Sequence, residues 1–409
     1  MKILTINWTY KYGSTGKIIL DIENELSNCN FLHCVEYKTL DVAENVYVLT
    51  GWIACRVYNR MTKVKGLQYE NGWWPTTKLI RKIERFRPDI VHIHCPNGHT
   101  LNLYRLLNFL KKSGIPTVIT NHAEFFYTGN CPHAFECTQY LSGCKQCDNY
   151  HTATNSLIWN RAPVAWNKMY GAFSNFERLE MVCVSDWQAK RLQNSKICSG
   201  IKCSVIYNGV DTDTFKAGVY DRQRKERIVL FVTASFSDDR KDPKGGKYVI
   251  ELAKKLEQNY PDIRFWVVGP DRTSGEMLPP NMKSLGEITD QKELAEIYAK
   301  ADLTIIASKR ETFGMACVES MCCGTPVVGF ENGGTESIAL KEYSRFVPYN
   351  DMQALENVII EWVYKKMHLN IEQFCSIAQE KYSKRTMAQK YYELYRQMLS
   401  LEGEENDAD

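Results

Sequence analysis

The residues best suited to chemistry lie in one run, 308–327, which reads SKRETFGMACVESMCCGTPV. Glu311 and Glu319 stand eight positions apart in this run, with Phe313 and Gly314 between them. A loop that ends at Phe313-Gly314 and passes into a helix leaves backbone N–H groups unpaired at the positive end of the helix dipole, where a phosphate binds favourably. The glutamates could accept hydrogen bonds from hydroxyls on either side of that phosphate. The run therefore predicts a site for a nucleotide sugar, which has hydroxyls on both sides of its diphosphate.

The same run resembles the E-x7-E signature of family 4 of the retaining glycosyltransferases, which have the two-domain GT-B fold. In that family the first Glu contacts the donor sugar and the second contacts the ribose of the nucleotide. The resemblance implies that Glu311 is a catalytic residue and that Glu319 binds the donor, together with the loop residues Phe313, Gly314 and Met315. The alternative is an ordinary surface helix, which does not need Phe-Gly before it and Gly-Thr-Pro after it.

His122 follows an apolar segment, at the edge where open parallel sheets place their ligand crevice. Members of the family often have His-Asp at this place, whereas this chain has Ala123 and then Glu124. The resemblance implies a catalytic role for His122 and leaves its orienting partner open, with Glu124 the nearest replacement. The alternative is a histidine of the core. His94 and Asn97, after the preceding strand, lie at a similar edge.

A departing nucleoside diphosphate concentrates negative charge, so fixed cations should stand beside it. The family usually supplies an Arg at the end of the first strand of the second domain and a Lys a few residues later. Here Ser235 occupies the Arg position, and Lys244 matches the Lys. We expect Lys244 to be catalytic and Arg240 or Lys241 to replace the missing Arg at the donor. A solvated basic loop is the alternative.

Two glycine-rich turns resemble parts of the family's donor site. Gly13 and Gly16 follow the first apolar segment and look like a Walker A loop, but only two residues separate them and Ile18 follows the Lys, which disfavours an NTPase. The family places this loop near the donor phosphates, so both glycines are expected to bind the donor by close backbone approach. Gly333 and Gly334 resemble the loop that lines the donor site.

The resemblance implies a same-face displacement, in which a phosphate oxygen takes the acceptor proton. Glu311 and His122 would hold the sugar while Lys244 stabilises the departing charge, so catalysis is positioning plus electrostatics and needs no catalytic metal. The sequence Asp211-Thr212-Asp213 superficially matches a DxD manganese site. Such sites belong to a different, single-domain glycosyltransferase fold, and these acids follow a turn at a domain junction.

Short apolar segments alternate with longer amphipathic ones, and this alternation occurs twice. It predicts an α/β protein with two Rossmann-like, doubly wound domains. The segments expected as buried strands are 2–7, 89–95, 116–122, 179–185, 227–235, 263–269, 302–308 and 325–330. Helical spacing is found at 77–86, 101–112, 245–258 and 291–301.

A turn signal at Asn208-Gly209 marks the expected junction between the domains. We expect an acceptor-binding domain at 1–208, with a cysteine-rich insertion at about 128–150, and a nucleotide-sugar-binding domain at 209–385. Residues 386–401 resemble the family's C-terminal helix, which crosses back to the first domain. Residues 402–409 form an acidic tail that we expect to be mobile.

Most of the fifteen cysteines lie singly in apolar surroundings and are expected to be reduced core residues. Four of them fall within seventeen residues and end in C-x-x-C, namely Cys131, Cys137, Cys144 and Cys147. This density favours a structural zinc site, closed to water and without chemistry of its own. The first pair is spaced more widely than in a usual zinc knuckle, so two disulfides or coincidence remain alternatives.

The composition of the 409 residues is that of a globular chain, with 44% hydrophobic and 24% charged residues. A net charge of +3 does not argue for nucleic acid as a partner. No apolar run approaches the roughly 20 residues that cross a bilayer, and the N-terminus lacks the pattern of a secretory signal. We therefore expect a cytoplasmic protein, either soluble or peripheral at the inner face of the cell membrane.

Residues 52–87 contain nine basic and two acidic side chains, interleaved with Trp52, Trp73 and Trp74. This surface would suit anionic lipid or a lipid-diphosphate-linked glycan, although two solvated helices explain the charges equally well. The resemblance implies a glycan or lipid-linked glycan acceptor in the synthesis of a surface polysaccharide, such as capsule, O-antigen or exopolysaccharide. The rival functions are a GT-B nucleotide-sugar epimerase or phosphorylase and a non-catalytic nucleotide-sugar-binding protein.

Overall fold

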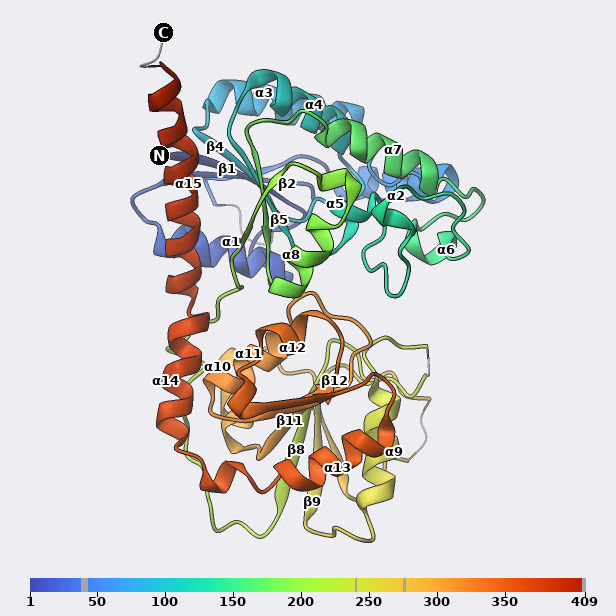
Figure 1. Cartoon of the computed structure of the whole chain (residues 1–409), viewed down its shortest axis with the longest axis vertical. Helices are drawn as coiled ribbons and strands as arrows, with labels where there is room; N and C mark the ends of the chain where they lie inside the picture. The colour runs from blue at the N-terminus through green and yellow to red at the C-terminus, as the bar shows by residue number, and fades with distance from the viewer. Residues whose placement is uncertain (38–42, 240, 275–276, 407–409) are drawn as a thin grey trace. The chain divides into compact units, whose positions relative to one another are not determined.

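The computed structural model describes residues 1–37, 43–239, 241–274 and 277–406. The chain forms two compact units (Figure 1). The N-terminal unit combines residues 1–207 with residues 387–409 at the other end of the chain, and the C-terminal unit comprises residues 208–386. Each unit is an α/β structure built on one parallel sheet, which confirms the predicted fold class.

The sheet of the N-terminal unit has the strand order β3-β2-β1-β4-β5-β6-β7, and all its neighbouring strands are parallel. Its strands are β1 (Lys2–Asn7), β2 (Asn30–Val35), β3 (Val46–Val48), β4 (Ile90–Ile93), β5 (Thr117–Asn121), β6 (Leu179–Cys183) and β7 (Lys202–Val205). The sequence indicated β1, β4, β5 and β6. Strands β2 and β3 were not predicted. A histidine interrupts the short apolar run of β2, and β3 has only three residues.

Helices cover both faces of this sheet because successive side chains of a strand point to opposite sides. Leu4 and Ile6 of β1 face a core completed by α3, α4 and α7, whereas Ile3 faces α1 and α15. The helices of this unit are α1 (Gly13–Glu25), α2 (Trp52–Lys65), α3 (Trp73–Phe86), α4 (Leu103–Ser113), α5 (Phe125–Thr128), α6 (Tyr150–Ala153), α7 (Ala162–Phe173) and α8 (Asp186–Gln193). Figure 1 shows α1 and the α3/α4 pair on opposite sides of the strands.

The C-terminal unit has a parallel sheet of six strands in the order β10-β9-β8-β11-β12-β13. Its strands are β8 (Arg227–Val232), β9 (Ile263–Val268), β10 (Met282–Gly286), β11 (Leu303–Ile306), β12 (Val327–Phe330) and β13 (Ser344–Val347). Its helices are α9 (Gly246–Leu256), α10 (Gln291–Lys300), α11 (Met315–Cys322), α12 (Gly334–Ile338), α13 (Met352–Trp362) and α14 (Ile371–Tyr382). Central strands are largely buried and read as mostly apolar runs, which is why the sequence indicated β8, β9, β11 and β12 but not the edge strands β10 and β13.

The last helix, α15 (Lys384–Asn406), packs on the sheet of the N-terminal unit. Met387, Tyr391 and Tyr395 are buried there against β1, β4, β5 and β6. The helix continues to Asn406, into the segment for which the sequence indicates an acidic tail.

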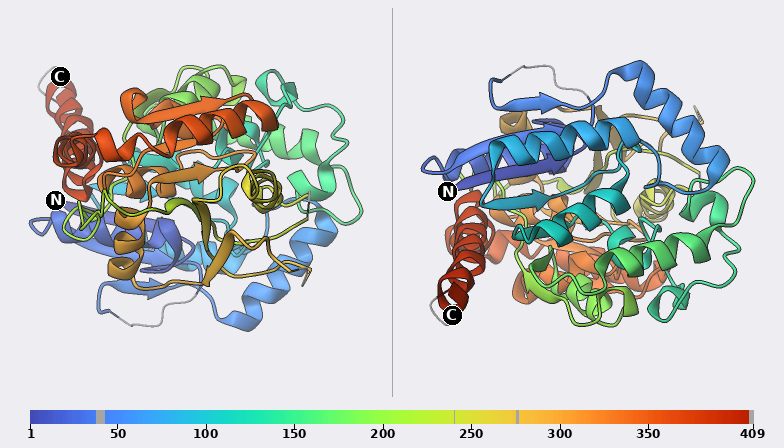
Figure 2. Two further views of the ribbon diagram at one scale, coloured as in Figure 1. Left: turned by 90° about the horizontal axis from the view of Figure 1, so that it is seen from below. Right: turned by 90° about the horizontal axis from the view of Figure 1, so that it is seen from above.

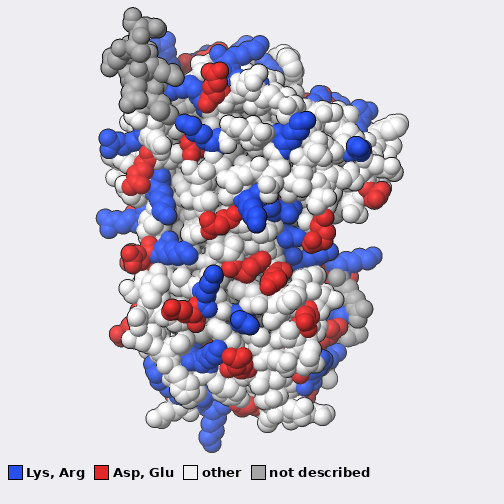
Figure 3. Space-filling view, in the orientation of Figure 1, with Lys and Arg blue, Asp and Glu red and all other residues white. Residues whose placement is uncertain are grey.

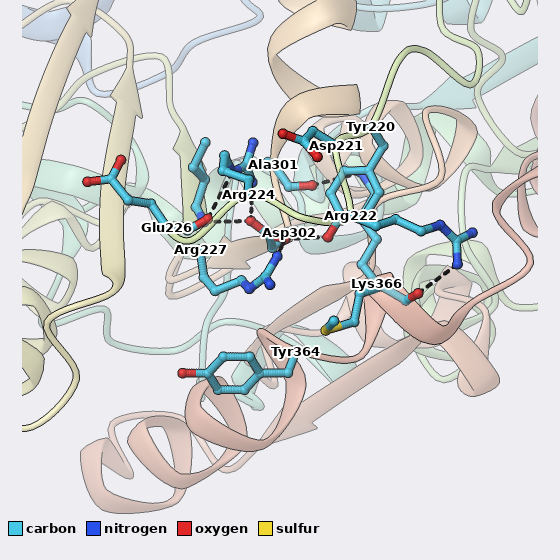
Figure 4. Close-up of polar contacts among 12 residues, drawn as sticks. Tyr220, Asp221, Arg222, Arg224, Glu226, Arg227, Ala301, Asp302, Tyr364 and Lys366 are labelled. Atoms are coloured by element: carbon cyan, nitrogen blue, oxygen red, sulfur yellow. Dashed lines mark hydrogen bonds and ion pairs between the residues drawn. The ribbon is translucent and has the colours of Figure 1, made fainter.

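A buried polar cluster fixes the base of the second sheet where β8 and β11 begin (Figure 4). The Asp302 carboxylate is fully buried and accepts hydrogen bonds from Tyr220, from Arg224 and from the backbone N–H of Ile228. Nearby, Nζ of Lys366 donates to the carbonyl oxygens of Ala299 and Ala301 at 2.6 and 2.7 Å and to Oγ1 of Thr325 at 2.7 Å. When the amine is protonated, each of its three donors therefore has an acceptor.

The described residues contain no helix that is long and apolar enough to span a membrane. On the face drawn in Figure 3, basic and acidic side chains are intermixed.

Candidate functional site

The turn that enters α11 depends on one left-handed glycine. Gly314 has φ +96°, and a Cβ at this position would lie 2.4 Å from Oγ1 of Thr335, so only glycine fits without a shift. It precedes an eight-residue helix that starts at Met315. Within the described residues, the backbone N–H groups of Met315 and Ala316 have no acceptor. The turn thus offers the unpaired amides that the sequence predicts for a phosphate.

Glu311 and Lys244 meet at the start of this turn. Nζ of Lys244 lies 2.7 Å from Oε1 of Glu311, and both side chains are partly exposed. The loop of Lys244 is tied to the loop of Glu311 through the backbone N–H of Lys309, which donates to the carbonyl of Pro243 at 2.7 Å. The structure therefore joins the two predicted catalytic residues of the C-terminal unit in one ion pair.

The turn at Gly333 and Gly334 supports Glu311 from the other side. The N–H of Gly334 donates to the carbonyl of Glu311 at 2.8 Å, and the N–H of Glu311 donates to the carbonyl of Asn332 at 3.2 Å. A Cβ on Gly334 would lie 2.3 Å from backbone atoms of Thr312. The N–H of Gly333 is used internally, because it donates to the Glu336 carboxylate at 2.7 Å. These two glycines place the Glu311 loop rather than offering free donors.

Glu319 lies on α11, where Oη of the fully buried Tyr298 donates to its Oε2 at 3.0 Å. The phenol holds one carboxylate oxygen, so the orientation of Glu319 is set by α10. Phe313, just before the turn, is buried and anchors it. Sequence reasoning did not find Tyr298, because nothing in its neighbourhood marks a tyrosine that reaches across to another helix.

The substitutes for the missing Arg are less well defined by the structure. Arg240 lies outside the described residues. Lys241 is described and exposed, and its backbone N–H donates to the Asp239 carboxylate at 2.9 Å. Ser235 lies near the start of the loop that follows β8, and its N–H donates to Oγ1 of Thr233 at 3.2 Å.

In the N-terminal unit, His122 lies directly after β5 and pairs with His94, which follows β4. Nε2 of His122 is 3.1 Å from Nδ1 of His94, and the two rings stack with centroids 5.4 Å apart. Burial lowers the pKa of His122 to about 4 and holds that of His94 well below its usual range. Both imidazoles are therefore neutral near pH 7.

A third histidine extends this contact to α15. The rings of His92 and His94 lie 3.8 Å apart between centroids. His92 is hydrogen-bonded through Nδ1 to Oη of Tyr395 at 2.6 Å and through Nε2 to Oγ1 of Thr120 at 2.8 Å. Helix α15 thus supports the His94–His122 pair through His92. Sequence reasoning could not find this contact, because Tyr395 is about 300 residues from His92.

Glu124, which the sequence offered as a partner for His122, has other contacts. Its fully buried carboxylate accepts from Nε of Arg191 at 2.7 Å, from Oη of Tyr127 at 3.0 Å and from the N–H of Ala134 at 2.6 Å. It fastens the cysteine-rich segment to α8. The His122 ring instead contacts His94, so Glu124 does not take the orienting role expected of it.

Gly13 and Gly16 both occur in the first turn of α1. Gly13 has φ +64°, and no atom lies within 4 Å of the place that a Cβ would occupy, so its backbone is open to approach. Gly16 is buried, and a Cβ there would lie 3.2 to 3.3 Å from the backbone of Lys11. Gly16 therefore allows the turn to pack closely against Lys11, while the backbone of Gly13 is open to approach by a ligand.

The four clustered cysteines are free thiols. Burial raises the pKa of the Cys131 thiol, and the neighbouring Cys144, Cys147 and Cys137 raise it further, so the four lie within electrostatic range of one another. Among the described residues, no three His, Cys, Asp or Glu side chains are arranged to hold a metal ion. Asp211 of the DxD-like run forms an ion pair with Nζ of Lys384 at 3.2 Å.

Two family models match adjacent parts of the chain. Residues 45–214 match the model described as Glycosyltransferase Family 4, and residues 216–374 match the model described as Glycosyl transferases group 1. The D-inositol 3-phosphate glycosyltransferase of Mycobacterium sp. (strain JLS) is 29% identical in an alignment of 174 residues that covers 38% of this chain and 37% of that relative. The probable sucrose-phosphate synthase of Thermosipho melanesiensis is 26% identical in an alignment of 329 residues that covers 72% of this chain and 72% of that relative.

Solved structures show the same architecture. The sucrose-phosphate synthase of Thermosynechococcus elongatus has a TM-score of 0.66 and 14% identity, covering 98% of this chain and 100% of that one. Anabaena Alr3699/HepE in complex with UDP has a TM-score of 0.64 and 17% identity, covering 97% and 100%. At these identities the likeness establishes the fold.

Proposed function

Since the chain belongs to family 4 of the glycosyltransferases, which are retaining enzymes of the GT-B fold, we propose that it transfers a sugar from a nucleotide-diphosphate sugar to an acceptor. One observation carries the proposal. The Lys244–Glu311 pair lies at a glycine turn that leads into the amide-lined start of α11. A cation, an acceptor for sugar hydroxyls and free N–H groups are the groups that an activated sugar requires.

We propose a UDP-sugar as the donor. Anabaena Alr3699/HepE, which shares the fold, has been solved with UDP and with UDP-glucose. The diphosphate would lie against the N–H groups of Met315 and Ala316, and its charge would draw Lys244 away from Glu311. The freed Glu311 carboxylate would then accept hydrogen bonds from the sugar, while Glu319 would hold the ribose.

In the proposed transfer, the sugar–phosphate bond breaks on the face where the new bond forms. A phosphate oxygen takes the proton of the acceptor hydroxyl, and the electron pair of the broken bond leaves with the nucleoside diphosphate. Lys244 stabilises that charge, and His122 contributes as a neutral imidazole that can bind a sugar hydroxyl. The proposal requires no catalytic metal, so turnover should not depend on added Mg²⁺ or Mn²⁺.

We propose that the acceptor is a glycan or lipid-linked glycan, and that the product is a surface polysaccharide made at the inner face of the cell membrane. The support is the family resemblance together with the basic and aromatic residues of 52–87. Trp52, Trp73 and Trp74 are all exposed and are available to such an acceptor.

We also propose that Cys131, Cys137, Cys144 and Cys147 bind a structural zinc ion once it is supplied. Their mutual proximity supports this, and binding would require the thiols to shift into tetrahedral geometry. Metal analysis of the purified protein should find one zinc per chain, and Cys144→Ser with Cys147→Ser should lose it. The proposal would be contradicted if the purified protein contained no zinc and adding zinc left its melting temperature unchanged.

The reaction is tested by measuring whether the purified protein slowly hydrolyses UDP-glucose. The quantity measured is the release of UDP. We expect release from the wild type and none above background from Glu311→Ala. Conversion of the donor into an epimer without UDP release would favour an epimerase. Tight donor binding without any chemistry would favour a non-catalytic binding protein.

A further inference from the structure

Helix α2 has a composition that differs from the other helices of the N-terminal unit. Its fourteen residues, WIACRVYNRMTKVK, include four basic side chains and no acidic one. It also contains five large apolar side chains that are exposed, namely Trp52, Ile53, Val57, Met61 and Val64. A helix of a globular domain usually buries such residues, so an apolar row in solvent requires an explanation.

The exposed apolar residues of α2 form one face. Ile53, Val57, Met61 and Val64 recur at intervals of four, four and three residues, which places them in a row along the helix. Ile53 is 71% exposed and Val57 is 51% exposed. The opposite side of the helix is the one that packs on the protein, because Thr62 there is fully buried. In Figure 2 (right), α2 runs along the outer edge of the N-terminal unit.

A neighbouring loop adds three more apolar side chains to this surface. Leu157, Ile158 and Trp159 are each more than half exposed. The loop is fastened to the end of α2, since the N–H of Leu157 donates to the carbonyl of Lys63 at 2.9 Å. A Cβ on Gly66, the residue that ends α2, would lie 2.9 Å from the carbonyl oxygen of Trp159. The loop and the helix therefore belong to one surface with a fixed backbone.

Positive charge borders the apolar row along one side. Arg56, Arg60 and Lys63 follow one another at intervals of four and three residues, which places them beside the row. The guanidinium of Arg56 lies over the Trp52 ring, with Cζ 4.3 Å from the ring centroid, and the Arg56 side chain remains exposed. Helix α2 contains no acidic side chain, and basic side chains that flank an apolar helix face suit the headgroup region of a bilayer.

We propose that α2 and the 157–159 loop form a docking surface for a bilayer that contains anionic lipid. The apolar row would enter the boundary between headgroups and acyl chains, and the basic row would pair with anionic headgroups. The helix would lie in the plane of the membrane. This proposal deepens the membrane-side acceptor proposed above, which rests on the same segment 52–87, whereas none of these residues belongs to the donor site.

The test is sedimentation of the full-length protein with vesicles. We expect binding to phosphatidylcholine vesicles that contain phosphatidylglycerol and weaker binding to phosphatidylcholine alone. The double variant Ile53→Gln/Val57→Gln should reduce binding roughly tenfold or more, and Arg56→Glu/Arg60→Glu should reduce it with anionic vesicles to a similar extent. Val219→Gln, which changes a 91% exposed valine of the C-terminal unit, is the matched control and should bind as the wild type does.

Three outcomes would overturn the proposal. The wild type would fail to sediment with anionic vesicles, or the Ile53→Gln/Val57→Gln protein would bind as strongly as the wild type. Alternatively, light scattering would show a dimer that this double variant dissociates, which would assign the face to a second copy of the chain. Hydrolysis of UDP-glucose without vesicles and without an acceptor reports on the donor site alone. Its rate should be equal in all variants, so loss of membrane binding and failure of the proposed donor chemistry are told apart.

Discussion

Nζ of Lys244 and Oε1 of Glu311 are 2.7 Å apart although 67 residues separate them in the chain. Each residue comes from a loop that follows a neighbouring strand of the sheet, β8 or β11. Open parallel sheets bind ligands where such loops meet at the carboxyl ends of their strands. The pair therefore gives the proposed donor site both a cation and a hydroxyl acceptor.

Replacing Lys244 by Met should reduce donor turnover by about 10²- to 10³-fold, because the departing diphosphate loses a fixed cation. Initial rates of UDP release measure this. Lys247→Met is the matched control, since Lys247 is paired with Glu251 on the surface of α9 and lies three residues away. Equal rates for Lys244→Met and the wild type would remove Lys244 from the mechanism.

Gly334→Ala should impair turnover while leaving the fold in place. The new Cβ would meet backbone atoms of Thr312 at 2.3 Å, so the loop that carries Glu311 must shift. We expect a loss of about 1 to 3 kcal/mol in unfolding free energy, as for overpacking, together with slower UDP release. Gly171→Ala in α7 has no neighbour within 4 Å and should be neutral or stabilising. Wild-type kinetics in Gly334→Ala would contradict the positioning role.

His94 should keep His122 neutral over the working range of pH. Burial lowers the pKa of His122 to about 4, so UDP release should show no inflection near pH 6.5 from this group. In His94→Ala, water reaches the His122 ring, its pKa should return toward the ordinary value, and an inflection should emerge between about pH 5 and 7. A pH–rate profile of the same shape in both proteins would reduce His94 to a packing residue.

Lys366 should make the unfolding free energy depend on pH above neutrality. Burial lowers its pKa from 10.5 to about 7, so folding disfavours the charged form of the amine relative to the unfolded chain. The cost of the charged form is then complete below pH 7, and the group's contribution to stability rises as pH increases from 7 toward 10.5. Chemical denaturation between about pH 6 and 9 should show that the unfolding free energy of the wild type rises with pH relative to that of Lys366→Met. Lys365→Met, at a half-exposed neighbouring position, should show no such trend. A constant difference between the wild type and Lys366→Met would refute the shift.

The sequence was sufficient for the architecture and for much of the donor turn. Central strands such as β8 and β11 are buried on both faces, so they appear as mostly apolar runs from which the doubly wound pattern could be predicted. Edge strands such as β3 and β13 are short, and nothing local distinguishes them from loops. The Phe313-Gly314 turn was predictable from the glycine before a helix and from the E-x7-E resemblance, and the structure adds that Gly314 has a left-handed backbone packed against Thr335.

The supporting contacts could not be predicted, because they join residues that are distant in the sequence. Tyr298 reaches Glu319 from another helix, and His94 reaches His122 from a neighbouring strand. The neighbour in sequence, Glu124, was the natural candidate partner for His122, but Arg191 and two other donors occupy its carboxylate. Proximity along the chain is a poor guide when parallel strands bring other residues to the same edge.

The most direct test of the donor site is the thermal stability of the protein with UDP-, GDP-, ADP- and TDP-sugars. A UDP-sugar at a hundred times its dissociation constant should stabilise the wild type by about 2.7 kcal/mol, and Glu319→Ala should lose most of this gain. If no nucleotide sugar stabilises the wild type, or if Glu319→Ala is stabilised as strongly, then the turn at α11 is not the place where an activated sugar binds.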